Sequence, residues 1–290
     1  MRDQAEKLRM KMLENLGALG RSIAVVSGKG GVGKSNFTTN FAIMLARLGK
    51  KVVILDMDIG MGNVNILIGK NAQYNLKDYL VGKVPLSDVI LDGPNNLKYI
   101  SGGSGLSSVI QWSPTMFQSL ITAFETLQKN FDYIFFDMGA GATNWSLDLL
   151  TSIDEIFVIS TTEPTSVTDA YSMMKYIHLR DENKKFYLVV NRAFTNEEGK
   201  ETAIRLKNTM LKFLSKEITI LGSLPEDPSV RKAVIDQVPF SILFPNSPVT
   251  LTLIEMVKKF VNAQLEEVYA PVQSDSFLKK LKNIFSKGRG

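Results

Sequence analysis

The stretch at residues 27–35, SGKGGVGKS, constrains the fold more strongly than any other part of the chain. Its Gly-x4-Gly-Lys-Ser spacing is that of a phosphate-binding loop, and it lies between an apolar run at 23–26 and a helical pattern at 36–48. Such a loop needs a strand before it and a helix after it, because its backbone N–H groups and the helix N-terminus bind the phosphates together. The stretch therefore predicts one strand–loop–helix unit of a parallel sheet.

The rest of the chain alternates short apolar runs with longer amphipathic stretches. The apolar runs are typical of strands buried on both faces, and they lie at residues 52–55, 97–100, 133–136, 156–159, 186–190 and 218–221. The helical patterns lie at residues 114–129, 165–180, 198–215 and 250–267. This alternation predicts an α/β fold, a three-layer sandwich around a mostly parallel twisted sheet. Ligands of such sheets bind beyond the carboxyl ends of the strands.

Polar residues at these strand ends complete a predicted nucleotide site. Lys34 is expected to reach the β- and γ-phosphates of a bound triphosphate. Asp137 follows one apolar run, and Asp56 and Asp58 follow another. Asp also begins ordinary turns, but three of them on two strands favour a site. The predicted metal ligands, for Mg²⁺, are Ser35, Asp56 and Asp137. The predicted nucleotide ligands from the loop are Gly28, Lys29, Gly30, Gly31, Val32, Gly33, Lys34, Ser35 and Asn36.

Composition excludes several other classes of protein. The chain has no cysteine, which excludes a disulfide framework and a cysteine-ligated iron–sulfur cluster. It has no run of 18 apolar residues, and its first residues show no signal peptide, so we expect a cytoplasmic protein. Residues 276–290 carry five basic residues and no acid, which accounts for the whole net charge of +5. The basic character is therefore local.

The second lysine of the loop, Lys29, identifies a family. KGGVGKS resembles the deviant Walker A motif of the MinD/ParA ATPases, and the resemblance covers most of residues 22–265. It implies that Lys29 reaches the phosphates of a partner subunit in an ATP-dependent homodimer. It also implies that Asp58 positions the attacking water, so the predicted catalytic residues are Lys29, Lys34 and Asp58. Asp137 matches the Walker B aspartate, although the family's Pro-Ala-Gly after it is here Met-Gly-Ala-Gly. The alternative for Lys29 is a solvated loop charge.

The same resemblance implies where the base binds. VVNR places Asn191 and Arg192, and PEDPSVRKA places Pro225, where relatives hold adenine. Asn after a strand is also an ordinary turn residue. The chain has no guanine-reading Thr/Asn-Lys-x-Asp motif, so the expected cofactors are ATP and Mg²⁺. The predicted activity is slow, dimer-dependent hydrolysis of ATP to ADP and phosphate.

The C-terminal tail is predicted to bind an anionic membrane surface as an amphipathic helix. Its predicted membrane-binding residues are Phe277, Leu278, Leu281, Ile284 and Phe285 on the apolar stripe, with Lys279, Lys280 and Lys282 around it. Because one short helix binds weakly, two tails in a dimer would bind with avidity. The alternatives are that the stripe packs on the protein's own surface or on a partner, or that the lysines bind nucleic acid.

The N-terminus resembles a more specific group within the family. Asp3–Arg9 reads DQAEKLR, which is similar to the DQAxxLR segment of FlhG (also called YlxH), a MinD-like regulator of flagellar number and placement. The resemblance implies that this segment stimulates FlhF, an SRP-type GTPase. The predicted partner-binding residues are Asp3, Gln4, Ala5, Leu8 and Arg9. The alternative is a helix packed on its own domain.

Together these patterns predict three parts: an N-terminal partner-activating helix at 1–20, a MinD-like ATPase domain at 21–270, and a linker with the membrane-targeting helix at 271–290. We expect a cytoplasmic protein that is reversibly peripheral on the inner face of the cell membrane. The alternatives are a MinD-like regulator of the division site, a ParA-like DNA partition ATPase, and a scaffold that binds nucleotide without hydrolysing it.

Overall fold

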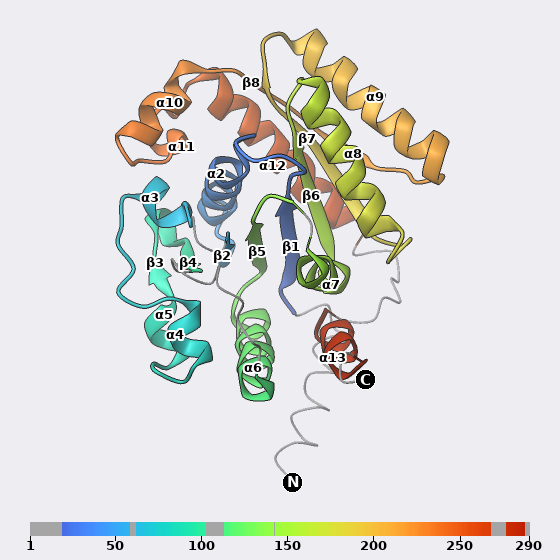
Figure 1. Ribbon diagram of the computed structural model, residues 1–290. Coiled ribbons are helices and arrows are strands. Elements are labelled where there is room, and N and C mark those ends of the chain that lie inside the picture. The colour runs from blue at the N-terminus through green and yellow to red at the C-terminus, as the bar shows by residue number, and fades with distance from the viewer. Residues whose placement is uncertain (1–18, 59–61, 103–112, 142, 268–276, 288–290) are drawn as a thin grey trace.

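A single eight-stranded sheet organises the chain (Figure 1). The computed structural model describes residues 19–58, 62–102, 113–141, 143–267 and 277–287, without the side chains of 144, 145, 264–267 and 283–287. The strand order is β3-β4-β2-β5-β1-β6-β7-β8. The strands are β1 (Arg21–Val26), β2 (Val52–Met57), β3 (Leu91–Asp92), β4 (Lys98–Ile100), β5 (Tyr133–Met138), β6 (Glu155–Ser160), β7 (Lys185–Ala193) and β8 (Thr219–Pro225).

All strand pairs are parallel except β3 with β4 at one edge. The mostly parallel sheet is therefore confirmed, with every apolar run of the sequence inside or overlapping a strand. The two-residue strand β3 was not predicted, because it is too short to produce an apolar run. The run at 218–221 marked only the start of β8, which continues through Gly222 and Ser223 to Pro225.

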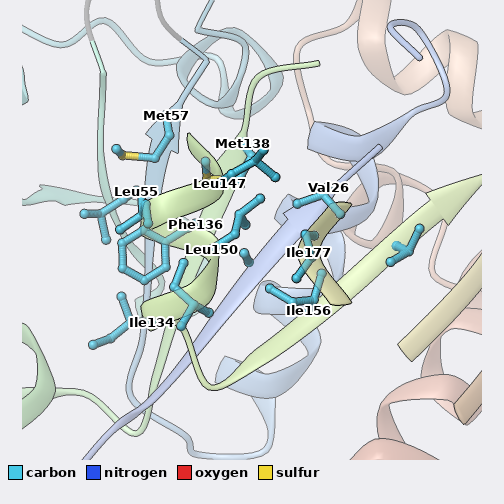
Figure 2. Close-up of a cluster of buried hydrophobic side chains, with 14 of the residues drawn as sticks. Val26, Leu55, Met57, Ile134, Phe136, Met138, Leu147, Leu150, Ile156 and Ile177 are labelled. Carbon is cyan, nitrogen blue, oxygen red and sulfur yellow. The ribbon is translucent and has the colours of Figure 1, made fainter. Parts of the chain in front are cut away.

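Alternation along the strands builds two separate cores, one on each face of the sheet. In β1, Ala24 and Val26 belong to one cluster of buried residues, while Ile23 and Val25 belong to the other. Figure 2 shows part of the first cluster, where Phe136 of β5 lies among side chains from neighbouring elements. Successive residues of a strand point to opposite faces, so both faces of this sheet need a covering layer.

Helices supply these two layers, which confirms the three-layer sandwich. The first core is covered by α4 (Leu76–Leu80), α5 (Leu86–Val89), α6 (Pro114–Asn130), α7 (Asn144–Ser152), α8 (Pro164–His178), α9 (Asn196–Leu214) and α13 (Phe277–Lys287). The second is covered by α2 (Lys34–Arg47), α3 (Val64–Ile68), α10 (Pro228–Ile235), α11 (Phe240–Leu243) and α12 (Pro248–Glu267). A 3₁₀ turn, η1 (Pro94–Asn96), precedes β4.

Several short helices were not predicted from the sequence. Five of the described helices, α3, α4, α5, α10 and α11, have eight residues or fewer, and the nine-residue α7 was missed as well. One or two turns are too few to show a 3.6-residue period. Local signals did exist, because Asn75 and Asp78 form a capping box at the start of α4. None of the described helices is long and apolar enough to cross a membrane.

Candidate functional site

The glycine-rich loop lies at the carboxyl end of β1 and leads into α2, as its motif predicted. Gly33 takes the left-handed conformation, with φ of 89°, and Phe37 N–H donates to its carbonyl oxygen at 2.9 Å. Gly28 packs so tightly that a Cβ there would lie 2.2 Å from the Asp169 carbonyl oxygen of α8. Two glycines of the motif are thus required by conformation and by space.

A buried ion pair lies directly under this loop. Lys34 Nζ donates to Asp137 Oδ1 at 2.9 Å, and both side chains are almost fully shielded from solvent. The Thr38 hydroxyl, which the sequence analysis missed, lies 3.3 Å from the same oxygen. Among the described residues, the second oxygen, Asp137 Oδ2, is buried and has no hydrogen-bond partner. A buried carboxylate oxygen of this kind is costly unless a cation or a water satisfies it.

These groups fit a Mg²⁺ ion bound together with phosphates. Ser35 lies in the first turn of α2, on the same loop as Lys34, and Asp137 Oδ2 offers an acceptor close by. Mg²⁺ in nucleotide sites takes only one or two carboxylates, and phosphates and water complete its octahedron. No group of three or more His, Cys, Asp or Glu side chains in the described part of the chain forms a metal site of its own. The roles of Ser35 and Asp137 as ligands stay predictions.

Asp56 instead holds the backbone of the following segment. Its Oδ1 accepts from Asp58 N–H at 3.1 Å, and its Oδ2 accepts from Val64 N–H at 3.2 Å. Burial, and then the nearby Asp137 carboxylate, raise the pKa of Asp56 to about 6. With both oxygens engaged, Asp56 fixes the segment that carries Asp58, and its role as a direct metal ligand stays a prediction.

Asp58 lies beside the segment that follows Asp137. A Cβ on Gly139, just beyond the end of β5, would lie 3.3 Å from Asp58 Oδ1. Burial raises the pKa of Asp58, and the nearby Lys34 ammonium opposes that shift. Asp58 is half-buried, so a carboxylate that water can reach stands beside the loop that follows Asp137. Its water-positioning role is consistent with this place and stays a prediction.

A cavity of about 280 Å³ opens beside the glycine loop. All three residues predicted to hold the base, namely Asn191, Arg192 and Pro225, line it, together with Asn36 from the predicted loop ligands. The Asn191 side chain donates to the Val32 carbonyl at 2.8 Å, and Arg192 donates to Glu226 at 2.7 Å. Sequence reasoning missed the apolar part of the lining, which comes from Phe37, Leu224, Val230, Phe240 and Val249. The size and the mixed lining suit an adenine ring.

The second lysine of the loop lies on the surface. Lys29 Nζ donates to Glu163 Oε2 at 2.8 Å and lies 3.2 Å from the Thr165 hydroxyl, both at the start of α8. The Lys29 ammonium lowers the pKa of the exposed Glu163 carboxyl. An exposed ion pair of this kind is weak, because water competes for both charges, so Lys29 is easily withdrawn from it. The pairing with Glu163 was not predicted, because the two residues are far apart in the chain.

The tail helix, α13, lies on the domain itself (Figure 1). Phe277 and Leu281 are 1% and 0% exposed, and Leu278 is also buried. The Phe277 ring lies 5.5 Å from that of Phe124 in α6 and 5.8 Å from that of Phe136 in β5. The helix is confirmed, and the alternative in which its stripe packs on the protein's own surface is the one found in this structure.

Two lysines of the tail helix form ion pairs beside this contact. Lys280 lies 3.6 Å from Asp181, and Lys282 lies 2.6 Å from Glu125 of α6. Asp181 also pairs with the buried Lys184 at 3.2 Å. Lys184 in turn donates to the Thr151 carbonyl at the end of α7, at 2.9 Å. The side chains of 284 and 285 and the whole predicted partner-binding segment at 3–9 lie outside the described residues.

With this geometry in place, comparisons with known proteins assign the family. A family profile described as "ParA: NUBPL iron-transfer P-loop NTPase" matches residues 18–261. The chain belongs to the MinD/ParA family. Iron transfer is not carried over to this member, since the chain has no cysteine. The Lys29-containing loop, the acidic residues at the strand ends and the parallel sheet are thus those of a P-loop NTPase of this family.

Individual relatives narrow the family to its flagellar members. The antiactivator FleN of Pseudomonas aeruginosa is 35% identical over 82% of this chain and 85% of its own length. The flagellum site-determining protein YlxH of Helicobacter pylori is 30% identical over 77% of this chain and 76% of its own length. The FlhG-type assignment is thereby confirmed.

Solved structures confirm the fold. The septum site-determining protein MinD of Pyrococcus horikoshii, solved with Mg-ADP, superposes with a TM-score of 0.71 at 24% identity. The match covers 88% of this chain and all of that one.

The raised pKa of Asp56 predicts how the stability of the nucleotide-free and magnesium-free protein depends on pH. The folded state binds a proton more tightly than the unfolded state, so raising the pH from about 4 to 7 should cost stability. Relative to Asp56→Asn, the wild-type free energy of unfolding should fall across this window by up to about 3 kcal/mol, at 1.36 kcal/mol per pH unit. Urea unfolding of both proteins at several pH values measures the difference. Parallel pH profiles would contradict the placement of Asp56.

Proposed function

We propose that this protein is an ATP-dependent dimerising ATPase of the FlhG type, which controls flagellar number and placement. The contrast between its two loop lysines supports the proposal most directly. Lys34 is buried on Asp137, whereas Lys29 lies in exposed contacts with Glu163 and Thr165 beside the phosphate loop. A cation that its own site does not bury, beside a phosphate loop, suits delivery to a second subunit's nucleotide.

ATP would first rearrange the buried pair. A triphosphate in the loop competes with Asp137 for the Lys34 ammonium, and it carries more negative charge than one carboxylate. Bound Mg²⁺ would neutralise charge on the phosphates, with Ser35 and Asp137 as its ligands from this chain. Asp58 would orient the attacking water beside Gly139, and Lys29 of the second subunit would stabilise the transferring phosphoryl group.

The flagellar role rests on the relatives. FleN is an antiactivator by name and YlxH is a flagellum site-determining protein, and this chain covers most of both. Septum site-determining MinD proteins are 25% identical in Bacillus subtilis and 31% identical in Synechocystis, a range that includes YlxH, so among these relatives the identity that favours the flagellar role is that of FleN. The DQAxxLR segment at 3–9 agrees with the flagellar choice over cell division or DNA partition.

The dimer proposal predicts that removal of the Lys29 side chain abolishes dimerisation and slows ATP hydrolysis. Wild type should double in mass with ATP, whereas Lys29→Ala should stay monomeric and hydrolyse ATP at least about tenfold more slowly, because it lacks the cation supplied in trans. Asp58→Ala should accumulate the ATP-bound dimer. Light scattering with ATP, ADP and no nucleotide, together with phosphate release, measures both effects. The matched control Lys50→Ala should behave as wild type, and a Lys29→Ala protein that dimerises and hydrolyses normally refutes the scheme.

Membrane attachment would require the tail helix to leave its own domain. Phe277, Leu278 and Leu281 are buried in the structure, and each such side chain contributes roughly 1.5–3 kcal/mol. Insertion into a bilayer would rebury the same side chains, while Lys280 and Lys282 would exchange two carboxylates for anionic headgroups. Because the two states are similar in chemistry, a small change in the domain can shift the balance between them.

Helix α7 is positioned to transmit a change at the nucleotide site to the tail helix. It contacts the tail helix, and its N-terminus follows the segment after Asp137. The C-terminal end of α7 is held by Lys184. A nucleotide-driven movement of the segment after Asp137 would therefore displace the start of α7 and weaken its contact with the tail helix. In this scheme ATP releases the tail and pairs two tails for avid binding to the inner face of the cell membrane.

The membrane proposal predicts that reversing the charge of two lysines in the tail helix abolishes binding to anionic vesicles. Lys280→Glu with Lys282→Glu should abolish ATP-dependent sedimentation with vesicles rich in phosphatidylglycerol. The reversal also breaks the pairs with Asp181 and Glu125, so a loss cannot come from a tail locked on the domain. Lys207→Glu with Lys212→Glu on α9 makes the same change in net charge and should leave sedimentation intact. Unchanged sedimentation of the tail variant would remove the membrane role.

The N-terminal segment gives a separate test of the partner. A peptide of residues 1–20 should raise the turnover of an FlhF-type GTPase several-fold in a phosphate-release assay, because the segment alone carries Gln4, Leu8 and Arg9. Leu8→Asp in the same peptide should remove the effect by placing a charge on the apolar stripe. Stimulation that is absent at saturating peptide, or unaffected by Leu8→Asp, argues against this partner.

A further inference from the structure

The surface that holds the tail helix recognises a simple pattern. The α6–α7 surface, as we name it, consists of α6, α7 and the end of β5, with Asp181 and Glu125 at its rim. It buries Leu281 of the tail and pairs with the basic residue on each side of that leucine. Its ligand is therefore a helix with a Lys-Leu-Lys triplet and an apolar residue one turn earlier, Leu278.

The N-terminal segment carries the same pattern. Residues 7–9 read Lys-Leu-Arg and residues 280–282 read Lys-Leu-Lys. With Leu8 aligned on Leu281, the apolar residue three positions before is Ala5 in place of Leu278. Four positions after, Met12 takes the place of Phe285. An apolar stripe flanked by two cations thus occurs at both ends of the chain.

Only one register of the N-terminal segment satisfies the pattern. A second basic–apolar–basic triplet is centred on Met10, but the residue three positions before it is Lys7 and the residue four positions after it is Glu14. That register would place the Lys7 ammonium at the buried position of Leu278, at a high desolvation cost. The register centred on Leu8 keeps the stripe apolar.

The N-terminal segment also enters the domain beside this surface. Gly20 N–H donates to the Gln128 carbonyl of α6 at 2.8 Å, and the Gln128 side chain donates back to the Gly20 carbonyl at 3.1 Å. Gln128 lies about one helical turn, roughly 5 Å, beyond Phe124 and Glu125, which contact the tail. The residues between Arg9 and Gly20 can reach back across that distance. A tether this short gives an effective concentration of order mM.

We propose that the α6–α7 surface binds either the tail helix or the N-terminal segment, and that release of the tail lets residues 4–12 take its place. Lys7 would pair with Asp181, Arg9 with Glu125, and Leu8 would fill the position of Leu281. Gln4 and Ala5 replace Phe277 and Leu278, so the N-terminal segment buries less apolar surface and binds only once the tail has left.

Because of this exchange, only one end of the chain occupies the α6–α7 surface at a time, and the other end is available to bind elsewhere. A docked tail leaves residues 3–9 available to a partner, whereas a membrane-bound tail withdraws them. This consequence rests on the proposed membrane and partner functions, whereas the exchange itself does not. The chain would then stimulate its partner GTPase away from the membrane and cease to do so once attached.

Cross-linking in the full chain tests the exchange. The protein has no native cysteine, so Arg9→Cys with Glu125→Cys gives one defined pair for a short bismaleimide. Internal cross-linking should rise about fivefold or more when Leu281→Asp expels the tail, since the tethered segment then faces no competitor. Phosphatidylglycerol vesicles with ATP should have the same effect on the chain that keeps Leu281. The second route does not depend on the folding of the Leu281→Asp variant.

Matched controls make the result specific. Arg9→Cys with Glu255→Cys, on α12 at the opposite face of the sheet, should not cross-link internally in either state. Lys7→Glu should lower the yield in the tail-released chain, and Arg2→Glu should not. A cross-linking yield that is the same with the tail docked and released, or no cross-link after tail release, overturns the proposal. Failure in the vesicle arm alone would count against the membrane function and leave the exchange standing on the Leu281→Asp result.

Discussion

The end of strand β5 is the physical constraint on which the rest of the structure depends. Two consecutive residues there point to opposite faces of the sheet, as the pleat of a strand requires. Asp137 meets Lys34 under the glycine loop, and Phe136 lies against Phe277 of the tail helix on the other face. The nucleotide site and the tail therefore share one strand end, and neither can be rearranged without consequence for the other.

Electrostatics explains why the nucleotide site is ready to change. Lys34 and Asp137 are both buried, and each is tolerated there chiefly because of the other. Asp137 nevertheless keeps one buried oxygen without a hydrogen-bond partner in the described structure, and Asp56 is buried beside it at an energetic cost. Such a cluster is poised to accept a cation and a phosphate, because binding supplies the interactions that the protein alone leaves unmade.

The sequence was sufficient to predict the parts of the structure that depend on residues close together in the chain. Apolar runs marked the parallel strands, and the spacing of glycine, lysine and serine marked the phosphate loop. Contacts between distant residues could not be predicted: Lys29 with Glu163, Thr38 with Asp137, and Lys280 with Asp181. The tail shows the same limit, because its apolar stripe predicted a buried face without indicating what would bury it.

The tight packing of Gly28 bears on which parts of the domain can move when a nucleotide binds. With no room for even a Cβ against the Asp169 carbonyl, the phosphate loop lies in direct contact with α8 at Gly28. In the proposed scheme, nucleotide-driven rearrangement would then fall on the segment that carries Asp58 and on the chain between β5 and α7. The absence of a side chain at position 28 would in this way direct the movement away from α8 and toward the tail helix.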